Sequence, residues 1–142
     1  MEFRKILVPV SGTEADEEAI KLACWLAKKT KGEVRAVYVI TVKRSLPIDA
    51  EIETEIRKAE GILDHVESIA EEEDCEVETD LLQARDAGPT IIDEAVEKDV
   101  DLILIGVKYK RHFGQFSLGS AVPYVLKNAL CRVILYHQPT SD

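Results

Sequence analysis

Short runs of consecutive apolar residues alternate along the chain with longer segments in which apolar residues recur every three or four positions. Uninterrupted apolar runs are typical of strands covered on both faces of a parallel sheet. They predict strands over residues 3–10, 34–42, 77–83, 101–106 and 131–136. The helical spacing between them predicts amphipathic helices over residues 13–32, 52–70, 88–96 and 122–129. The alternation predicts an α/β fold: a doubly wound five-stranded parallel sheet with right-handed crossovers and helices on both faces.

Open parallel sheets bind ligands beyond the carboxyl ends of their strands, at the point where the strand order reverses. We expect the order 3-2-1-4-5, which places the reversal between the first and fourth strands. This order brings Val10-Ser11-Gly12 beside Gly106-Val107-Lys108. The first helix should begin there, because Thr13 and Asp16 resemble a capping box. The topology alone therefore predicts where a site would lie.

The segment after the fourth strand has features that suit an anion. It holds three cations within four residues, at Lys108, Lys110 and Arg111, and it closes with Gly119 and Ser120 at the start of a helix. Glycine permits close backbone approach, and Ser120 can cap the helix or donate its hydroxyl. A helix start also presents unpaired amides with partial positive charge. On composition alone, an ordinary helix cap beside a solvated loop explains the same residues equally well.

Three stretches carry a resemblance to a known family: the opening Arg4–Val10, the strand Asp101–Gly106, and Gly119-Ser120 followed by a helix and a final strand. Together they resemble the universal stress protein family. The resemblance covers nearly the whole chain and implies a single domain spanning residues 1–142. Nucleotide-binding members of that family carry a motif with fixed spacing. A first glycine is followed after two residues by a second glycine, and after nine more residues by a glycine and then a serine or threonine. Gly106, Gly119 and Ser120 match this pattern, whereas Tyr109 replaces its second glycine. Ser11 stands where the family usually has aspartate.

The resemblance implies a cytoplasmic stress-response protein that is homodimeric and binds ATP or a related adenine nucleotide, with or without Mg²⁺, as a regulatory ligand. Adenine would lie beside residues at the ends of the first two strands, namely Pro9, Val10, Ser11 and Val39. The ribose and phosphates would be held by Gly106, Lys108, Gly119, Ser120 and Ala121. Because Ser11 and Tyr109 depart from the motif, a dimeric scaffold of the same fold, which binds no nucleotide and acts through protein contacts, is the alternative.

The last strand, Val133-Ile134-Leu135-Tyr136, should form one edge of the sheet. An uncovered apolar edge invites pairing with another chain. In the family that this chain resembles, the strand pairs antiparallel across a two-fold axis, so we expect a homodimer through these four residues. Alternatively, the tail after the strand protects the edge, because Pro139 cannot donate to a further ladder.

Charge and composition narrow the classes of partner. The 142 residues carry a net charge of −9, and residues 51–80 alone hold thirteen acids and two bases. A negative field repels phosphates, so neither nucleic acid nor an anionic membrane is an expected partner. No stretch reaches the ~18 apolar residues of a membrane span. These properties favour a cytoplasmic protein.

The nucleophilic and titratable residues predict no catalytic or metal site. Cys24, Cys75 and Cys131 are odd in number, lie far apart and form no CxxC pair, so we expect reduced, buried thiols. His65 and His112 are not paired in sequence with any nucleophile. We therefore predict no enzyme, with weak ATP hydrolysis left as a third alternative.

Overall fold

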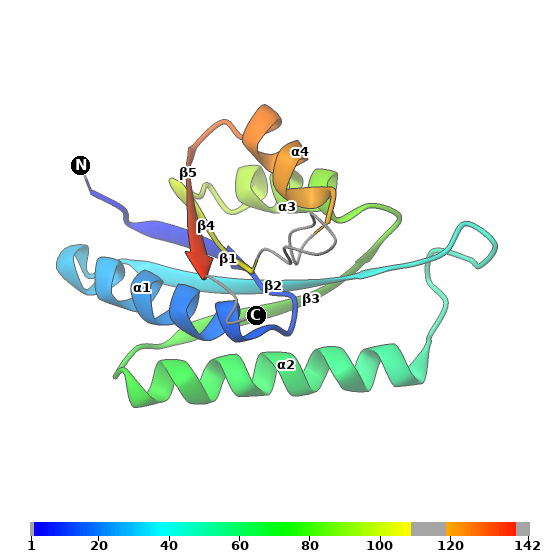
Figure 1. The fold of residues 1–142 in the computed structure, drawn as a ribbon, viewed down its shortest axis with the longest axis horizontal. Coiled ribbons are helices and arrows are strands. Elements are labelled where there is room, and N and C mark those ends of the chain that lie inside the picture. The colour runs from blue at the N-terminus through cyan, green and yellow to red at the C-terminus, as the bar shows by residue number, and fades with distance from the viewer. Residues whose placement is uncertain (1, 109–118, 139–142) are drawn as a thin grey trace.

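The computed structural model describes residues 2–108 and 119–138, and its elements alternate as the hydrophobic pattern predicts (Figure 1). The strands are β1 (Lys5–Pro9), β2 (Glu33–Thr41), β3 (Val77–Ala84), β4 (Leu102–Lys108) and β5 (Arg132–Gln138). The helices are α1 (Glu14–Thr30), α2 (Glu53–Glu72), α3 (Ala87–Glu97) and α4 (Ala121–Asn128). Strands β4 and β5 each run two residues beyond the predicted end, because Val107 and Lys108 pair with His137 and Gln138.

The five strands form one parallel sheet in the order β3-β2-β1-β4-β5, which confirms the predicted order and fold class. The pairing between β2 and β3 is the longest, from Val34 opposite Val77 to Thr41 opposite Ala84. The order reverses between β1 and β4, as expected. Any site that follows from the topology should therefore lie where these two central strands end.

Helices cover both faces of the sheet, with α1 and α2 on one face and α3 and α4 on the other (Figure 1). Successive residues of β1 alternate between the two layers, as strand geometry requires. Ile6 and Val8 pack in the core cluster under α1 and α2, whereas Leu7 packs in the cluster under α3 and α4. Each face of the central strands is thus covered, which explains why their sequences are apolar without interruption.

The pairing between β1 and β4 is short and ends early. Only Ile6 and Leu7 pair with β4, whereas β1 stays paired with β2 as far as Pro9. The amides of successive residues point to opposite neighbours, and the amide of Val10 donates to the Val37 carbonyl on β2 at 2.9 Å. Residue 9 would therefore donate toward β4, but proline has no amide hydrogen. Pro9 thus helps to end the β1–β4 ladder at the point where the strand order reverses.

Helix α2 presents one apolar face to the sheet and one acidic face to solvent. Its buried side chains are small or aliphatic: Ala59, Leu63, Val66, Ile69 and Ala70. The charged residues between them are exposed, which accounts for most of the acidic excess of residues 51–80. Within the described ranges, no helix has both the length and the apolar character that a bilayer crossing requires.

Candidate functional site

A hollow of about 220 Å³ lies at the carboxyl ends of β1 and β2, beside the first turns of α3. It is lined mainly by apolar residues: Pro9, Val10, Ser11, Val37, Tyr38, Val39, Thr41, Ala87 and Ile91. The four residues expected beside adenine, Pro9, Val10, Ser11 and Val39, are all in this lining. The fold therefore brings them together, beside the position where the strand order reverses.

Five lining residues were not predicted from the sequence. Val37 and Thr41 lie two residues on either side of Val39, so strand alternation could have indicated them. Ala87 and Ile91 are four apart on α3 and thus share a helix face, but only the tertiary packing shows that this face borders the hollow. Tyr38 packs in the cluster under α1 and α2, so it borders the hollow with its backbone.

The loop from β1 to α1 is organised by one buried carboxylate, Asp16, which is 5% exposed. Its oxygens accept hydrogen bonds from the Ser11 amide at 3.1 and 3.2 Å and from the Gly12 amide at 2.6 Å. Burial raises the pKa of Asp16, and the bonds from these amides partly oppose the rise. Gly12 has φ +89°, a conformation that suits glycine. Asp16 thus occupies the amide of Ser11, which lines the hollow, and the amide of Gly12 next to it.

The capping box is present only in part. Asp16 reaches back from the first turn of α1 as expected, but Thr13 makes no side-chain capping hydrogen bond within the described residues. The hydroxyl oxygens of Ser11 and Thr13 are both buried, and neither has a hydrogen-bond partner among the residues that the structure describes. A buried hydroxyl without a partner is costly, and a ligand hydroxyl could satisfy it. Ser11 lines the hollow itself.

The β4 side of the site contains Gly106 and Lys108. A Cβ at Gly106 would lie 2.3 Å from the carbonyl oxygen of Ala15, so this glycine permits the close packing of α1 on β4. Lys108 is the last residue of β4, and its Nζ lies 3.4 Å from Oε2 of Glu14 at the start of α1. The Lys108 side chain is 29% exposed, and among the residues that the structure describes its ammonium pairs with one carboxylate, that of Glu14.

The start of α4 lies on the same face of the sheet as the hollow. Ala121 is buried in the cluster that also contains Val37 and Ile91, two residues of the hollow's lining. Gly119 has φ +54°, and a Cβ there would meet no atom of the described residues within 4 Å. Ser120 is at the N-cap position, but it has helical angles, and its hydroxyl makes no capping bond within the described part of the chain. The expectation that Ser120 caps α4 is therefore wrong, because a helical ψ turns its side chain away from the free amides.

Three residues of the predicted cationic segment, Tyr109, Lys110 and Arg111, lie outside the described residues, as do His112 and Pro139. The strand predicted to form the dimer does lie at an edge of the sheet: β5 pairs with β4 alone among the described strands. Its four residues, Val133, Ile134, Leu135 and Tyr136, are partly exposed.

The sheet order and the alternation of strands and helices agree with the fold that the sequence predicted. A model of the family described as "Universal stress protein family" matches residues 2–137. The chain belongs to the universal stress protein family. The solved structure of hypothetical protein MJ0577 shares this fold, with a TM-score of 0.76 and 21% identity over 99% of this chain and 100% of the other.

Among universal stress proteins, the chain is similar to Universal stress protein MJ0531 of Methanocaldococcus jannaschii, with 33% identity over 99% of this chain and 85% of the relative. It is 29% identical to Universal stress protein YxiE of Bacillus subtilis, over 94% of this chain and 98% of the relative. Among solved structures, a universal stress protein from Archaeoglobus fulgidus in complex with dAMP is 25% identical, with a TM-score of 0.73. That alignment covers 95% of this chain and 98% of the other.

Proposed function

We propose that this universal stress protein binds an adenine nucleotide as a regulatory ligand in the hollow at the ends of β1 and β2, without efficient turnover. The observation that carries the proposal is the apolar lining around Ser11, whose buried hydroxyl has no partner among the described residues. Small-molecule sites are typically apolar and contain a few such polar groups. The similar Archaeoglobus fulgidus protein in complex with dAMP supports the choice of an adenine ligand.

The size of the hollow limits which part of the ligand it would hold. Its 220 Å³ is below the ~300–1,000 Å³ of typical small-molecule sites. The flat base would lie against Pro9, Val39 and Ile91, which offer apolar surfaces. A sugar hydroxyl would donate to or accept from Ser11, because a serine hydroxyl can do both. The phosphates would then lie outside the hollow.

The phosphates would extend toward the start of α4 and the end of β4. Helix starts present unpaired amides, and Gly119 leaves the backbone of this start uncovered by a side chain. Lys108 adds a cation at the end of β4, although Glu14 lies 3.4 Å from its Nζ. Because Asp16 occupies the amides of Ser11 and Gly12, the phosphates would depend on the α4 side of the site.

Calorimetric titration with ATP, AMP and GTP, each with and without Mg²⁺, tests this proposal. Val39→Phe places a ring in the hollow and should weaken adenine nucleotide binding by about tenfold or more, which corresponds to about 1.4 kcal/mol. Val96→Phe is the matched control, because Val96 lies on α3 outside the lining and is 58% exposed. The proposal would be contradicted if the wild type bound ATP and AMP more weakly than millimolar. It would also be contradicted if Val39→Phe bound adenine nucleotides as tightly as the wild type does.

A dimeric scaffold that acts through protein contacts is the second candidate, and the apolar surface near β5 favours it. Val96, Leu126 and Leu130 are 58%, 53% and 88% exposed. Val96 and Leu130 also line a hollow of about 220 Å³ that reaches Cys131, immediately before β5. Apolar side chains gathered beside an edge strand are typical of protein interfaces. A scaffold of this kind binds no nucleotide, so the calorimetric titration with ATP, AMP and GTP distinguishes the scaffold from the nucleotide-binding protein.

A further inference from the structure

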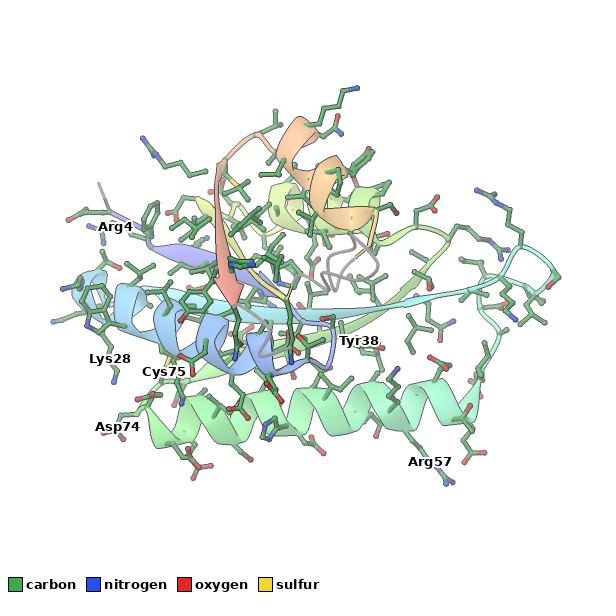
Figure 2. The ribbon with its side chains drawn as sticks, viewed as in Figure 1. Arg4, Lys28, Tyr38, Arg57, Asp74 and Cys75 are labelled. Carbon is green, nitrogen blue, oxygen red and sulfur yellow. The ribbon has the colours of Figure 1, made fainter. Side chains whose placement is uncertain are left out.

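One ion pair joins the carboxyl ends of the two central strands. Lys108 is the last residue of β4, and Glu14 is the first residue of α1, the helix that follows β1; Nζ and Oε2 lie 3.4 Å apart. Figure 2 shows Tyr38, which borders the hollow, near the start of α1, whereas Arg4 lies toward the other end of the sheet. The ion pair therefore lies at the same end of the sheet as the hollow, where the strand order reverses.

The start of α1 is acidic. Glu14, Asp16 and Glu17 all lie in its first turn. The Asp16 carboxylate accepts a hydrogen bond from the Ser11 amide at 3.1 Å, and Oε1 of Glu17 lies 2.9 Å from Nε2 of His65 on α2. A helix start attracts an anion, but these three carboxylates already supply the negative charge. The α1 side of the site therefore repels a ligand phosphate.

Glu14 is the carboxylate of this turn that can act directly on a ligand. Its side chain is 75% exposed, whereas Asp16 is buried. Glu14 also lies beside Lys108, the cation that the described part of β4 places at this end of the sheet. Ion pairs this exposed are weak, so a ligand phosphate can displace the carboxylate from the ammonium. The displaced carboxylate stays close to the phosphate, because both charges lie near the same strand end.

We propose that Glu14 selects against highly charged ligands, so that the site prefers an adenine ligand with at most one phosphate to ATP. This inference rests on the proposed binding of an adenine nucleotide in the hollow. Adenosine carries no phosphate charge, and ATP carries more negative charge than AMP. The repulsion from Glu14 therefore increases from adenosine to AMP to ATP, whereas the contacts of the base with the hollow stay the same.

Glu18 provides a matched control on the same helix. It lies one turn after Glu14, and its Oε1 is 3.9 Å from Nζ of Lys21. Glu18→Gln and Glu14→Gln change the net charge of the chain equally, but only Glu14 pairs with Lys108 among the residues that the structure describes. A difference between the two variants therefore measures the position of the charge.

Calorimetric titration of the full chain with adenosine, AMP and ATP, in EDTA so that no Mg²⁺ masks the phosphates, tests the proposal. The wild type should bind AMP more tightly than ATP. Glu14→Gln should raise the affinity for ATP by about fivefold, the effect of one charge on another about 4 Å away in water. The gain for AMP should be smaller, and the affinity for adenosine should not change. Added salt should reduce the difference between Glu14→Gln and the wild type, because exposed charges are screened.

The adenosine titration separates this inference from the proposed function. If adenosine binds, but Glu14→Gln leaves the ratio of ATP to adenosine affinity at the wild-type value, the role of Glu14 is overturned and the nucleotide site stands. An equal gain in Glu18→Gln, or a wild type that binds ATP more tightly than AMP, would also overturn the role of Glu14. If none of the three ligands binds at millimolar concentration, the proposed function and this inference both fail.

Discussion

Gly106 of β4 lies directly against the backbone of Ala15 in α1. A Cβ at position 106 would be 2.3 Å from the Ala15 carbonyl oxygen and 3.1 Å from the Ala19 Cβ. Neither contact can relax easily, because one atom is backbone and the other is the Cβ of a buried residue. The first glycine of the family's motif is thus explained in this chain by the packing of a helix on a strand, whether or not a ligand binds.

We therefore expect Gly106→Ala to destabilise the fold by about 2–3 kcal/mol or more, as overpacking of a close contact does. Gly61 is the matched control, because it lies in the middle of α2 and a Cβ there would meet no atom within 4 Å. Gly61→Ala should stabilise the protein by about 0.5–1 kcal/mol, since alanine is the better helix former. Urea unfolding of the two variants measures both effects. Equal stability of Gly106→Ala and the wild type would mean that α1 does not pack on β4 as described.

The carboxyl of Glu94 on α3 is buried, 6% exposed, and lies beside Asp80 on β3. Burial raises the pKa of Glu94, and the bond to Asp80 raises it further, although Lys98 opposes the rise. Burial would also raise the pKa of Asp80, but the bonds from Glu94 and Arg35 outweigh it and lower that pKa. The pair therefore favours one protonated and one ionised carboxyl.

This carboxyl pair predicts that Glu94→Gln changes the free energy of unfolding in a pH-dependent way. A raised pKa in the folded state means that the contribution of Glu94 to stability is complete below its ordinary pKa of 4.5 and is lost as the pH rises through the folded value. Glutamine stays neutral and can still donate to Asp80. Glu94→Gln should thus be nearly as stable as the wild type near the ordinary pKa and more stable at neutral pH, by about 1 kcal/mol.

Thermal or urea unfolding between acidic and neutral pH measures this difference. Asp93→Asn is the control, because Asp93 is exposed on the same helix and should show no such trend. A Glu94→Gln variant that is less stable than the wild type at neutral pH would show that the fold does not raise the pKa of Glu94.

The edge position of β5 predicts a homodimer, as an open apolar edge favours pairing with a second chain. Light scattering should give twice the chain mass of 15.9 kDa at micromolar concentration. Val133→Lys places a charge on the edge strand and should shift the mass to that of the monomer. Leu46→Lys should stay dimeric, because Leu46 lies in the loop between β2 and α2. A monomer mass for the wild type would contradict the dimer.

The positions of the strands and helices could be predicted because apolar runs and helical spacing are local properties of the sequence. The strand order that we expected then placed Ser11 and Gly106 at the ends of the two central strands. The lining residues that the sequence did not predict depend on tertiary packing. Ala87 and Ile91 border the hollow only because α3 packs beside β1 and β2, and the sequence around them reads as an ordinary helix start.

The expectations for polar side chains were less successful than those for the strands, because several geometries satisfy the same residue pattern. Thr13 and Asp16 matched a capping box, yet the carboxylate binds the Ser11 and Gly12 amides and the Thr13 hydroxyl makes no cap within the described residues. Ser120 matched an N-cap, but its helical angles do not allow that role. Small differences in ψ decide such contacts, and hydrophobic periodicity does not encode them.

Binding of an adenine nucleotide in the hollow beside Ser11 can be followed by amide chemical-shift changes on titration with AMP or ATP, measured by ¹⁵N-edited NMR of the full chain. The largest changes should fall on Ser11, Val39 and Ala121, while Leu130 and Val96 on the apolar surface near β5 should change little. No change at millimolar nucleotide, or changes centred on Leu130 and Val96, would rule out binding in this hollow.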